Sequence, residues 1–176
     1  YTKQAGLRYL YHPGPFKNWG HFELNESEFP NGWDGLKMCV EKAKKEGILL
    51  GLHTLSNFTT TNDQYVTPVP DPRLAKVGSS VLTQNIDDVQ IEIEIQSPDF
   101  FNQFKNNHLH GVMIGEELIR YETVSESAPW KLLNCERGAW KTKATAHKKG
   151  DETSKLIDHG YKVFLTNTEL DRKSVV

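Results

Sequence analysis

The fold class that the sequence predicts is α/β plus all-β: one β-loop-α-β unit is combined with a mainly antiparallel β domain. Apolar residues recur at helical spacing between residues 33 and 46, and strand-like segments lie on both sides of them. Residues 91–95, in contrast, alternate strictly between apolar and polar side chains, which is typical of a strand with one buried face. The 176 residues suffice for two small domains but fall short of the roughly 250 residues of a complete β/α barrel.

The first unit is expected to run from strand through loop and helix to a second strand. Residues 7–11 alternate like a short strand, which the run His12-Pro13-Gly14-Pro15 ends. The segment 33–46 then places four apolar residues on one helical face: Leu36, Cys39, Val40 and Ala43. Gly47 is a suitable helix stop, and the apolar run 48–52 suits a parallel strand that is covered on both faces.

Such a unit occurs both in open doubly wound sheets and in closed barrels. The first loop favours the barrel, because it is long, carries aromatic and polar side chains and has no glycine-rich phosphate turn. We therefore predict that residues 1–76 are a fragment of a (β/α)8 barrel. The strands and the helix stripe should share one buried cluster of Tyr9, Leu36, Val40, Leu50 and Leu52.

Residues 77–166 are expected to form an inserted β domain, and residues 167–176 a possible return to the barrel. Strand patterns occur near residues 91–95, 109–114, 117–124, 131–135 and 161–165. The side chains expected to face inward are Ile91, Ile93, Ile95, Leu118 and Val163. Arg137, Thr142 and His147 are interpreted as a buried polar clasp, whereas Glu116 and Glu117 are expected on a solvated edge.

Composition excludes several classes of protein. A net charge of -2 with interspersed acids and bases argues against a nucleic-acid partner, and a mean hydropathy of -0.58 argues against a membrane span. Cys39 and Cys135 are expected as buried free thiols. Because no histidines or cysteines share ligand spacing, we expect no metal, and the sequence indicates no cofactor.

The first half resembles a known group of enzymes. The runs Trp19-Gly20-His21-Phe22-Glu23-Leu24, Gly35-Leu36-Lys37 and Gly47 to Thr54 are similar to early barrel strands of glycoside hydrolases of the α-galactosidase and α-glucosidase type. The resemblance covers about residues 5–75. It implies a sugar-binding barrel whose catalytic carboxylates lie on later strands, and no position of this chain corresponds to them.

The second half resembles a small β module of bacterial polysaccharide-degrading proteins and phage tail proteins. The similarity rests on Gly115 to Glu122, on Cys135 to Ala144, and on His147 and Gly150. It covers about forty residues and implies a structural module more than an activity. Together the two resemblances imply a periplasmic or extracellular bacterial protein.

Five residues are candidates for sugar binding: Trp19, His21, Glu23, His53 and Asp63. Trp19 could stack on a sugar ring, and His21, Glu23 and His53 fall at strand ends, where barrel active sites are built. Asp63 could contact sugar or, as is more usual for aspartate in a loop, cap a turn, and the other four could instead be loop residues that are satisfied locally.

Two hypotheses for function remain open. The chain could belong to a glycoside hydrolase, contributing sugar-binding loops while the catalytic carboxylates, which are unknown, lie elsewhere in the parent protein. It could instead be a non-catalytic glycan-binding or assembly module. In both cases the partners are an oligosaccharide or polysaccharide and the remainder of the parent protein, and the isolated chain is predicted to be inactive.

Overall fold

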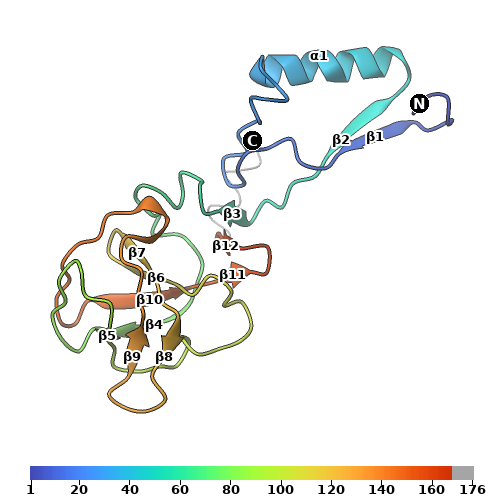
Figure 1. The fold of residues 1–176 in the computed structure, drawn as a ribbon. Coiled ribbons are helices and arrows are strands. Elements are labelled where there is room, and N and C mark those ends of the chain that lie inside the picture. Colours follow the sequence, from blue (N-terminus) through green and yellow to red (C-terminus); the bar gives the residue numbers. More distant parts are fainter. Residues whose placement is uncertain (168–176) are drawn as a thin grey trace. The chain divides into compact units, whose positions relative to one another are not determined.

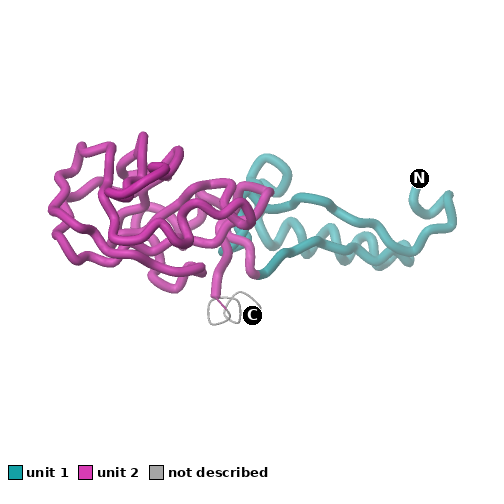
Figure 2. The backbone as a smooth tube through the Cα atoms, turned by 90° about the horizontal axis from the view of Figure 1, so that it is seen from below, with its two compact units in different colours: residues 1–56 teal, residues 57–176 magenta. Residues whose placement is uncertain are grey.

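The computed structural model describes residues 1–167, and its compact units divide between Ser56 and Asn57 (Figure 2). We call the part up to Ser56 unit 1 and the part from Asn57 unit 2. This division lies earlier than residue 76, because strand β3 (Phe58–Thr60) pairs with β12 (Val163–Leu165) and so belongs to the β-rich part. The expected return of residues 167–176 to the barrel lies outside the described residues, except for Asn167.

Unit 1 has the predicted order of strand, loop, helix and strand (Figure 1). Its elements are β1 (Tyr9–His12), α1 (Gly32–Lys45) and β2 (Leu49–Leu52). The two strands are parallel neighbours, with Tyr9 opposite Leu49 and His12 opposite Leu52. The β-loop-α-β connection is therefore confirmed.

The sequence explains where α1 ends. Lys42, Lys44 and Lys45 occupy its last turn, where positive charge complements the helix dipole. Gly47 follows with φ +74°, a left-handed conformation that glycine adopts without steric cost. The Gly47 N–H donates to the Lys44 carbonyl, so that the chain turns directly into β2.

The buried cluster predicted for unit 1 is wrong in most of its members. Leu36 is buried and Leu50 half-buried, but Tyr9 is 73% exposed, and Val40 and Leu52 are exposed as well. One helix cannot cover both faces of a two-stranded sheet. The small core instead joins Leu36 to residues of the β1–α1 loop: Phe16, Leu24 and Phe29.

An apolar cavity of about 330 Å³ remains between α1 and the two strands. Leu10 and Leu50 line it from the sheet, and Leu36 and Cys39 line it from the helix. Cys39 is an exposed free thiol, so its predicted burial is wrong, whereas Cys135 of unit 2 is free and buried as expected.

Unit 2 is mainly antiparallel β structure, as predicted. Three sheets have the strand orders β4-β10-β6-β7, β11-β12-β3 and β5-β9-β8, and all their pairings are antiparallel (Figure 1). The further elements are β4 (Lys76–Val81), β5 (Ile93–Glu94), β6 (Gly111–Ile114), β7 (Glu117–Arg120), β8 (Thr123–Val124), β9 (Lys131–Leu133), β10 (Glu152–Leu156), β11 (Asp158–His159) and a short 3-10 turn, Ala139–Lys141.

The four-stranded sheet is covered on both faces. Along β6, Val112 and Ile114 enter one apolar cluster, which also contains Ile93, while Met113 enters a second cluster around Phe164. This follows from the alternation of side chains along a strand. Both faces of β6 are therefore buried.

The inward-facing residues predicted for unit 2 are confirmed except for one. Ile93, Ile95, Leu118 and Val163 are buried, but Ile91 is 55% exposed. Strand β5 begins only at Ile93, and the chain before it turns around the carboxylate of Asp87, which accepts from the Val89 and Gln90 N–H groups. The alternation seen in the sequence thus extends beyond the strand. Within residues 1–167, no helix is long and apolar enough to cross a membrane.

Candidate functional site

Three rings lie together at the carboxyl ends of the parallel strands of unit 1. Tyr11 is in β1, His53 directly follows β2, and Trp19 lies in the loop after β1. The His53 ring centroid lies 6.4 Å from that of Tyr11 and 6.4 Å from that of Trp19, both in edge-on geometry. We call these three residues the aromatic rim. The structure thus brings together two predicted site residues, Trp19 and His53, and adds Tyr11, whose place at a strand end was the available signal.

Glu23 stabilises the loop that carries Trp19 and His21. Its carboxylate accepts from Asn18 Nδ2 at 3.1 Å and lies 3.1 Å from Lys17 Nζ, while its N–H donates to Asn18 Oδ1 at 2.9 Å. The Glu23 and Glu26 carboxylates raise the pKa of Lys17. His21 is exposed on the same loop. Glu23 therefore positions the loop, while part of its carboxylate remains open to solvent.

Asp63 is the one site candidate that lies in unit 2. It is fully buried, and its carboxylate accepts from the Tyr65 N–H at 2.9 Å. Its backbone carbonyl accepts from the N–H groups of Val66 and Thr67. These bonds correspond to the turn-capping alternative rather than to sugar contact.

In unit 2, the buried carboxylate of Glu117 is bonded to two of the residues predicted to form a polar clasp, Arg137 and His147. The Glu117 carboxylate accepts from Arg137 Nε at 2.8 Å and from Arg137 Nη2 at 2.9 Å. It also binds His147 Nε2 at 2.7 Å, the Gly138 N–H at 2.9 Å and the Thr145 N–H at 3.1 Å. We call Glu117, Arg137 and His147 the carboxylate clasp.

The clasp confirms the structural interpretation of Arg137 and His147 and corrects that of Glu117. Glu117 was expected on a solvated edge, yet its side chain is 0% exposed. Thr142 is buried nearby, accepting from the Leu118 N–H at 3.0 Å and donating to the Ala139 carbonyl. Leu118, the next residue of the same strand, points to the opposite face, so the apolar pattern gave no signal that Glu117 is buried.

The clasp is chemically satisfied. Burial alone would raise the pKa of Glu117, but hydrogen bonds from Arg137, Gly138, His147 and Thr145 outweigh it and hold the pKa below its ordinary value. The remaining Arg137 N–H groups donate to the carbonyls of Asp87, Gln90 and Thr145. This buried carboxylate therefore connects β7 to the loop that carries Arg137, Thr145 and His147, and it is not exposed to a substrate.

Among residues 1–167, no three His, Cys, Asp or Glu side chains lie so that they could hold a metal ion. Comparison with protein-family models, with curated proteins and with solved structures finds no match for this chain.

Proposed function

We propose that the chain is part of a carbohydrate-active protein, a glycoside hydrolase, in which unit 1 is one βα unit of a (β/α)8 barrel. The observation that carries the proposal is the aromatic rim of Tyr11, Trp19 and His53 at the carboxyl ends of β1 and β2. In barrels and open α/β sheets, ligands bind at this end of the strands.

The exposed apolar surface of unit 1 supports a larger barrel. Parallel sheets occur almost only with both faces covered. Here Tyr9, Leu10 and Leu49 are exposed on a pair of parallel strands, as is Leu52 at the end of β2. Further βα units of the parent protein would cover these side chains and add neighbours to both strands. This is the partner that we propose for unit 1.

The rim has the chemistry of a sugar subsite. Aromatic rings stack on the apolar faces of pyranose rings, while exposed imidazole groups can hydrogen-bond hydroxyls. Trp19 and His53 supply the first kind of contact, and His21, exposed on the loop braced by Glu23, is placed to supply the second.

A non-catalytic glycan-binding or assembly module is the second candidate. The carboxylate clasp favours it, because the buried carboxylate of Glu117 is used to build the fold and not to react. Under this alternative the chain binds glycan without cleaving it in any context.

The chain by itself is expected to bind sugar without hydrolysing it. Glycosidic cleavage usually needs two carboxyl groups about 5 to 9.5 Å apart across the sugar. We expect no turnover of a panel of aryl glycosides by the purified chain, but turnover by a longer segment of the same reading frame. Turnover by the chain alone that is lost in Glu23→Ala would contradict the placement of the catalytic carboxylates elsewhere. Inactivity of the longer segment would favour the non-catalytic alternative.

Binding at the rim is tested separately by affinity electrophoresis in gels that contain soluble polysaccharides. Trp19→Ala and His53→Ala should each reduce retardation, with an apparent Kd raised by about three- to tenfold, the loss expected for one aromatic contact. Trp33→Ala, which removes an exposed tryptophan of α1, is the matched control and should leave retardation unchanged. Equal losses in all three variants would show that the rim has no special role.

A further inference from the structure

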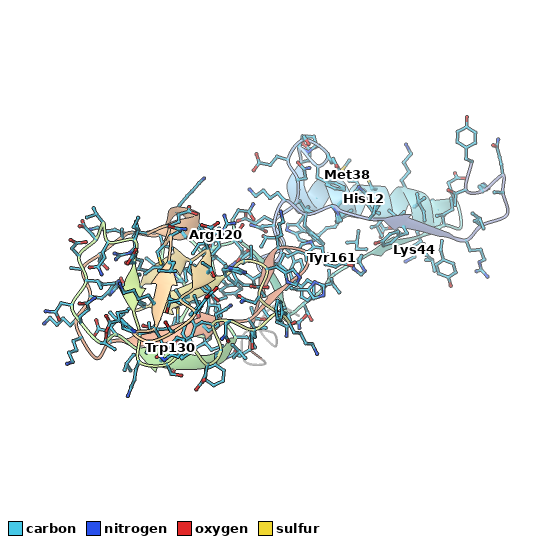
Figure 3. All side chains as sticks on the ribbon, turned by 60° about the horizontal axis from the view of Figure 1, so that its bottom comes forward. His12, Met38, Lys44, Arg120, Trp130 and Tyr161 are labelled. Atoms are coloured by element: carbon cyan, nitrogen blue, oxygen red, sulfur yellow. The ribbon has the colours of Figure 1, made fainter. Side chains whose placement is uncertain are left out.

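A second polar surface lies in unit 2, apart from the carboxylate clasp. Two cavities of about 340 Å³ and 260 Å³ adjoin there, because His110, Tyr121 and Glu122 line both of them. Arg120, Asn134 and Glu136 line the larger cavity, and the smaller one extends to Phe104. We call the two together the β7 groove, since Arg120 is the last residue of β7; its side chain is labelled in Figure 3.

The floor of the groove is fixed by hydrogen bonds. The His110 ring stacks on Tyr121 with centroids 5.0 Å apart and an interplanar angle of 27°. The Tyr121 hydroxyl donates to the Phe101 carbonyl and lies 3.3 Å from Asn107 Oδ1. His110 Nδ1 lies 2.9 Å from the Glu122 carbonyl and 3.2 Å from that of Tyr121. Because carbonyls only accept, Nδ1 carries the proton, and Nε2 of a neutral ring is left as an acceptor.

The polar side chains of the groove form one hydrogen-bonded pair and one ion pair. Asn134 Nδ2 donates to Glu122 Oε2 at 2.7 Å. Arg120 Nη1 lies 3.9 Å from Glu136 Oε2, and both of these side chains are largely exposed. Planar amide, carboxylate and guanidinium groups of this kind can bind adjacent hydroxyls with two hydrogen bonds each.

The smaller cavity of the groove also presents an aromatic ring. Phe104 lines the smaller cavity and is 99% exposed, so its ring is open to a ligand. Asn102 and Gln103 line the same cavity and supply amides beside the ring. An aromatic platform next to amides suits a sugar ring, which has one apolar face and a polar rim.

We propose that the β7 groove binds a neutral oligosaccharide. The lining charges comprise one guanidinium, that of Arg120, and two carboxylates, those of Glu122 and Glu136, so acidic sugars and phosphates are disfavoured. The groove is a second site, within unit 2, and only the choice of a glycan over other polar ligands rests on the proposed function.

The test is a residue-resolved NMR titration of the full chain, labelled with ¹⁵N. The probes are cellohexaose, xylohexaose, mannohexaose and chitohexaose at millimolar concentration, with oligogalacturonate as the acidic comparison. At least one neutral hexasaccharide should shift the amide signals of Phe104, Arg120 and Asn134, whereas oligogalacturonate should not. Phe104→Ala should weaken this binding by about three- to tenfold, and Tyr161→Ala, which removes another exposed ring of unit 2, should leave it unchanged.

The outcomes separate the two sites. Shifts confined to Tyr11, Trp19 and His53 would overturn the groove and support the rim. Shifts confined to the groove would support it and count against the rim. No shift at either site with any neutral probe would overturn both, and shifts with oligogalacturonate alone would overturn the proposed ligand class. Because the Phe104 side chain is wholly exposed, its variant should keep the amide spectrum of the folded chain, so that a lost contact is distinguished from unfolding.

Discussion

One carboxylate, that of Glu117, joins several separate segments of unit 2. It receives hydrogen bonds from Arg137, Gly138, Thr145 and His147, while Arg137 also reaches carbonyls of the turn before β5. Replacing one partner of a buried ion pair leaves the other charge uncompensated. The clasp should therefore be a major determinant of the stability of unit 2.

We expect Glu117→Gln to lower the free energy of unfolding by about 3 kcal/mol, since Arg137 would lose its counter-charge in a buried position. Denaturant unfolding at neutral pH measures the change. Glu116→Gln, the exposed neighbour, should change stability by less than about 0.5 kcal/mol. Adding Arg137→Met to Glu117→Gln should cost less than the sum of the two single changes. Additive losses would mean that the two side chains act independently.

The stability that Glu117 contributes should depend on pH. The pKa of Glu117 is lowered in the folded protein, so its contribution is complete above the ordinary carboxyl range and is lost as pH falls through the folded pKa. The stability difference between the chain and Glu117→Gln should shrink in acid.

Lys155 presents the opposite case. It is fully buried in β10, its Nζ donates to the Leu156 carbonyl at 2.6 Å, and it lies 4.0 Å from Asp158. Burial lowers its pKa from 10.5 to about 8, while Asp158 acts against the shift. Between these two values the unfolded chain binds more protons than the folded one, so stability rises with pH.

We therefore expect Lys155→Met to remove a stability increase of at most about 3 kcal/mol between pH 8 and 10.5, at about 1.4 kcal/mol per pK unit. The measurement is the difference in unfolding free energy between the chain and the variant across this range. Taking a difference cancels the ionisation of other groups. If the difference stays constant with pH, Lys155 is not desolvated in the folded chain.

At the scale of elements, Gly111 of β6 lies so close to Phe164 of β12 that a side chain at position 111 would not fit. A Cβ atom at Gly111 would lie 2.7 Å from Phe164 Cε1 and 2.8 Å from Phe164 Cζ. The Phe164 ring also contacts Trp140 edge-on, with centroids 5.0 Å apart. Because the Phe164 ring is fully buried and packed against Trp140, it cannot move away cheaply.

Gly111→Ala should accordingly destabilise the chain by about 1 to 3 kcal/mol through overpacking. Gly160→Ala is the control, because its Cβ would meet only ordinary contacts, the nearest being His108 Nε2 at 3.6 Å. Thermal unfolding of both variants measures the effect. The double variant Gly111→Ala, Phe164→Leu should lose less stability than the sum of the losses in the two single variants. Additive losses would contradict the contact.

Elements with apolar patterns could be predicted from sequence, and those built from polar residues could not. The stripe of α1 and the alternation at Ile93 and Ile95 gave correct elements. Strand β10 carries Thr153, Ser154 and Lys155, all buried, and no apolar alternation marks it. Its burial depends on β4 and β6, which pair with it from distant parts of the sequence.

The candidate site shows the same division. Trp19 and His53 could be predicted to lie together because both follow parallel strands, and the structure places their rings 6.4 Å apart. Asp63 could not be placed, since its role depends on a turn in unit 2. Glu117 could not be recognised as buried because its partner Arg137 lies twenty residues away in the sequence.

At the scale of the whole molecule, the two units differ in how much core they possess. Unit 2 contains two apolar clusters, including Val112 and Phe164, whereas the core of unit 1 consists of a few loop and helix residues around Leu36. Among the described residues, all the antiparallel sheets lie in unit 2. Unit 2 is therefore expected to fold without unit 1.

A polypeptide of residues 57–176 tests this expectation through its single cysteine, Cys135. Burial raises the pKa of that thiol to about 12, so a thiolate-specific reagent should react slowly in buffer and fully in denaturant. Unfolding followed by the same reaction should be cooperative. Rapid labelling in buffer would show that unit 2 needs unit 1 to fold.

The clasp also bears on how such a chain can change over evolutionary time. A lineage that loses Arg137 alone inherits a buried, unbalanced Glu117, and one that loses Glu117 alone inherits a stranded guanidinium. Intermediates of either kind are disadvantaged, while a joint exchange removes both charges and leaves neither one unbalanced. Among descendants of this sequence, Glu117 and Arg137 should therefore be kept or exchanged together, whereas exposed Glu116 is free to drift.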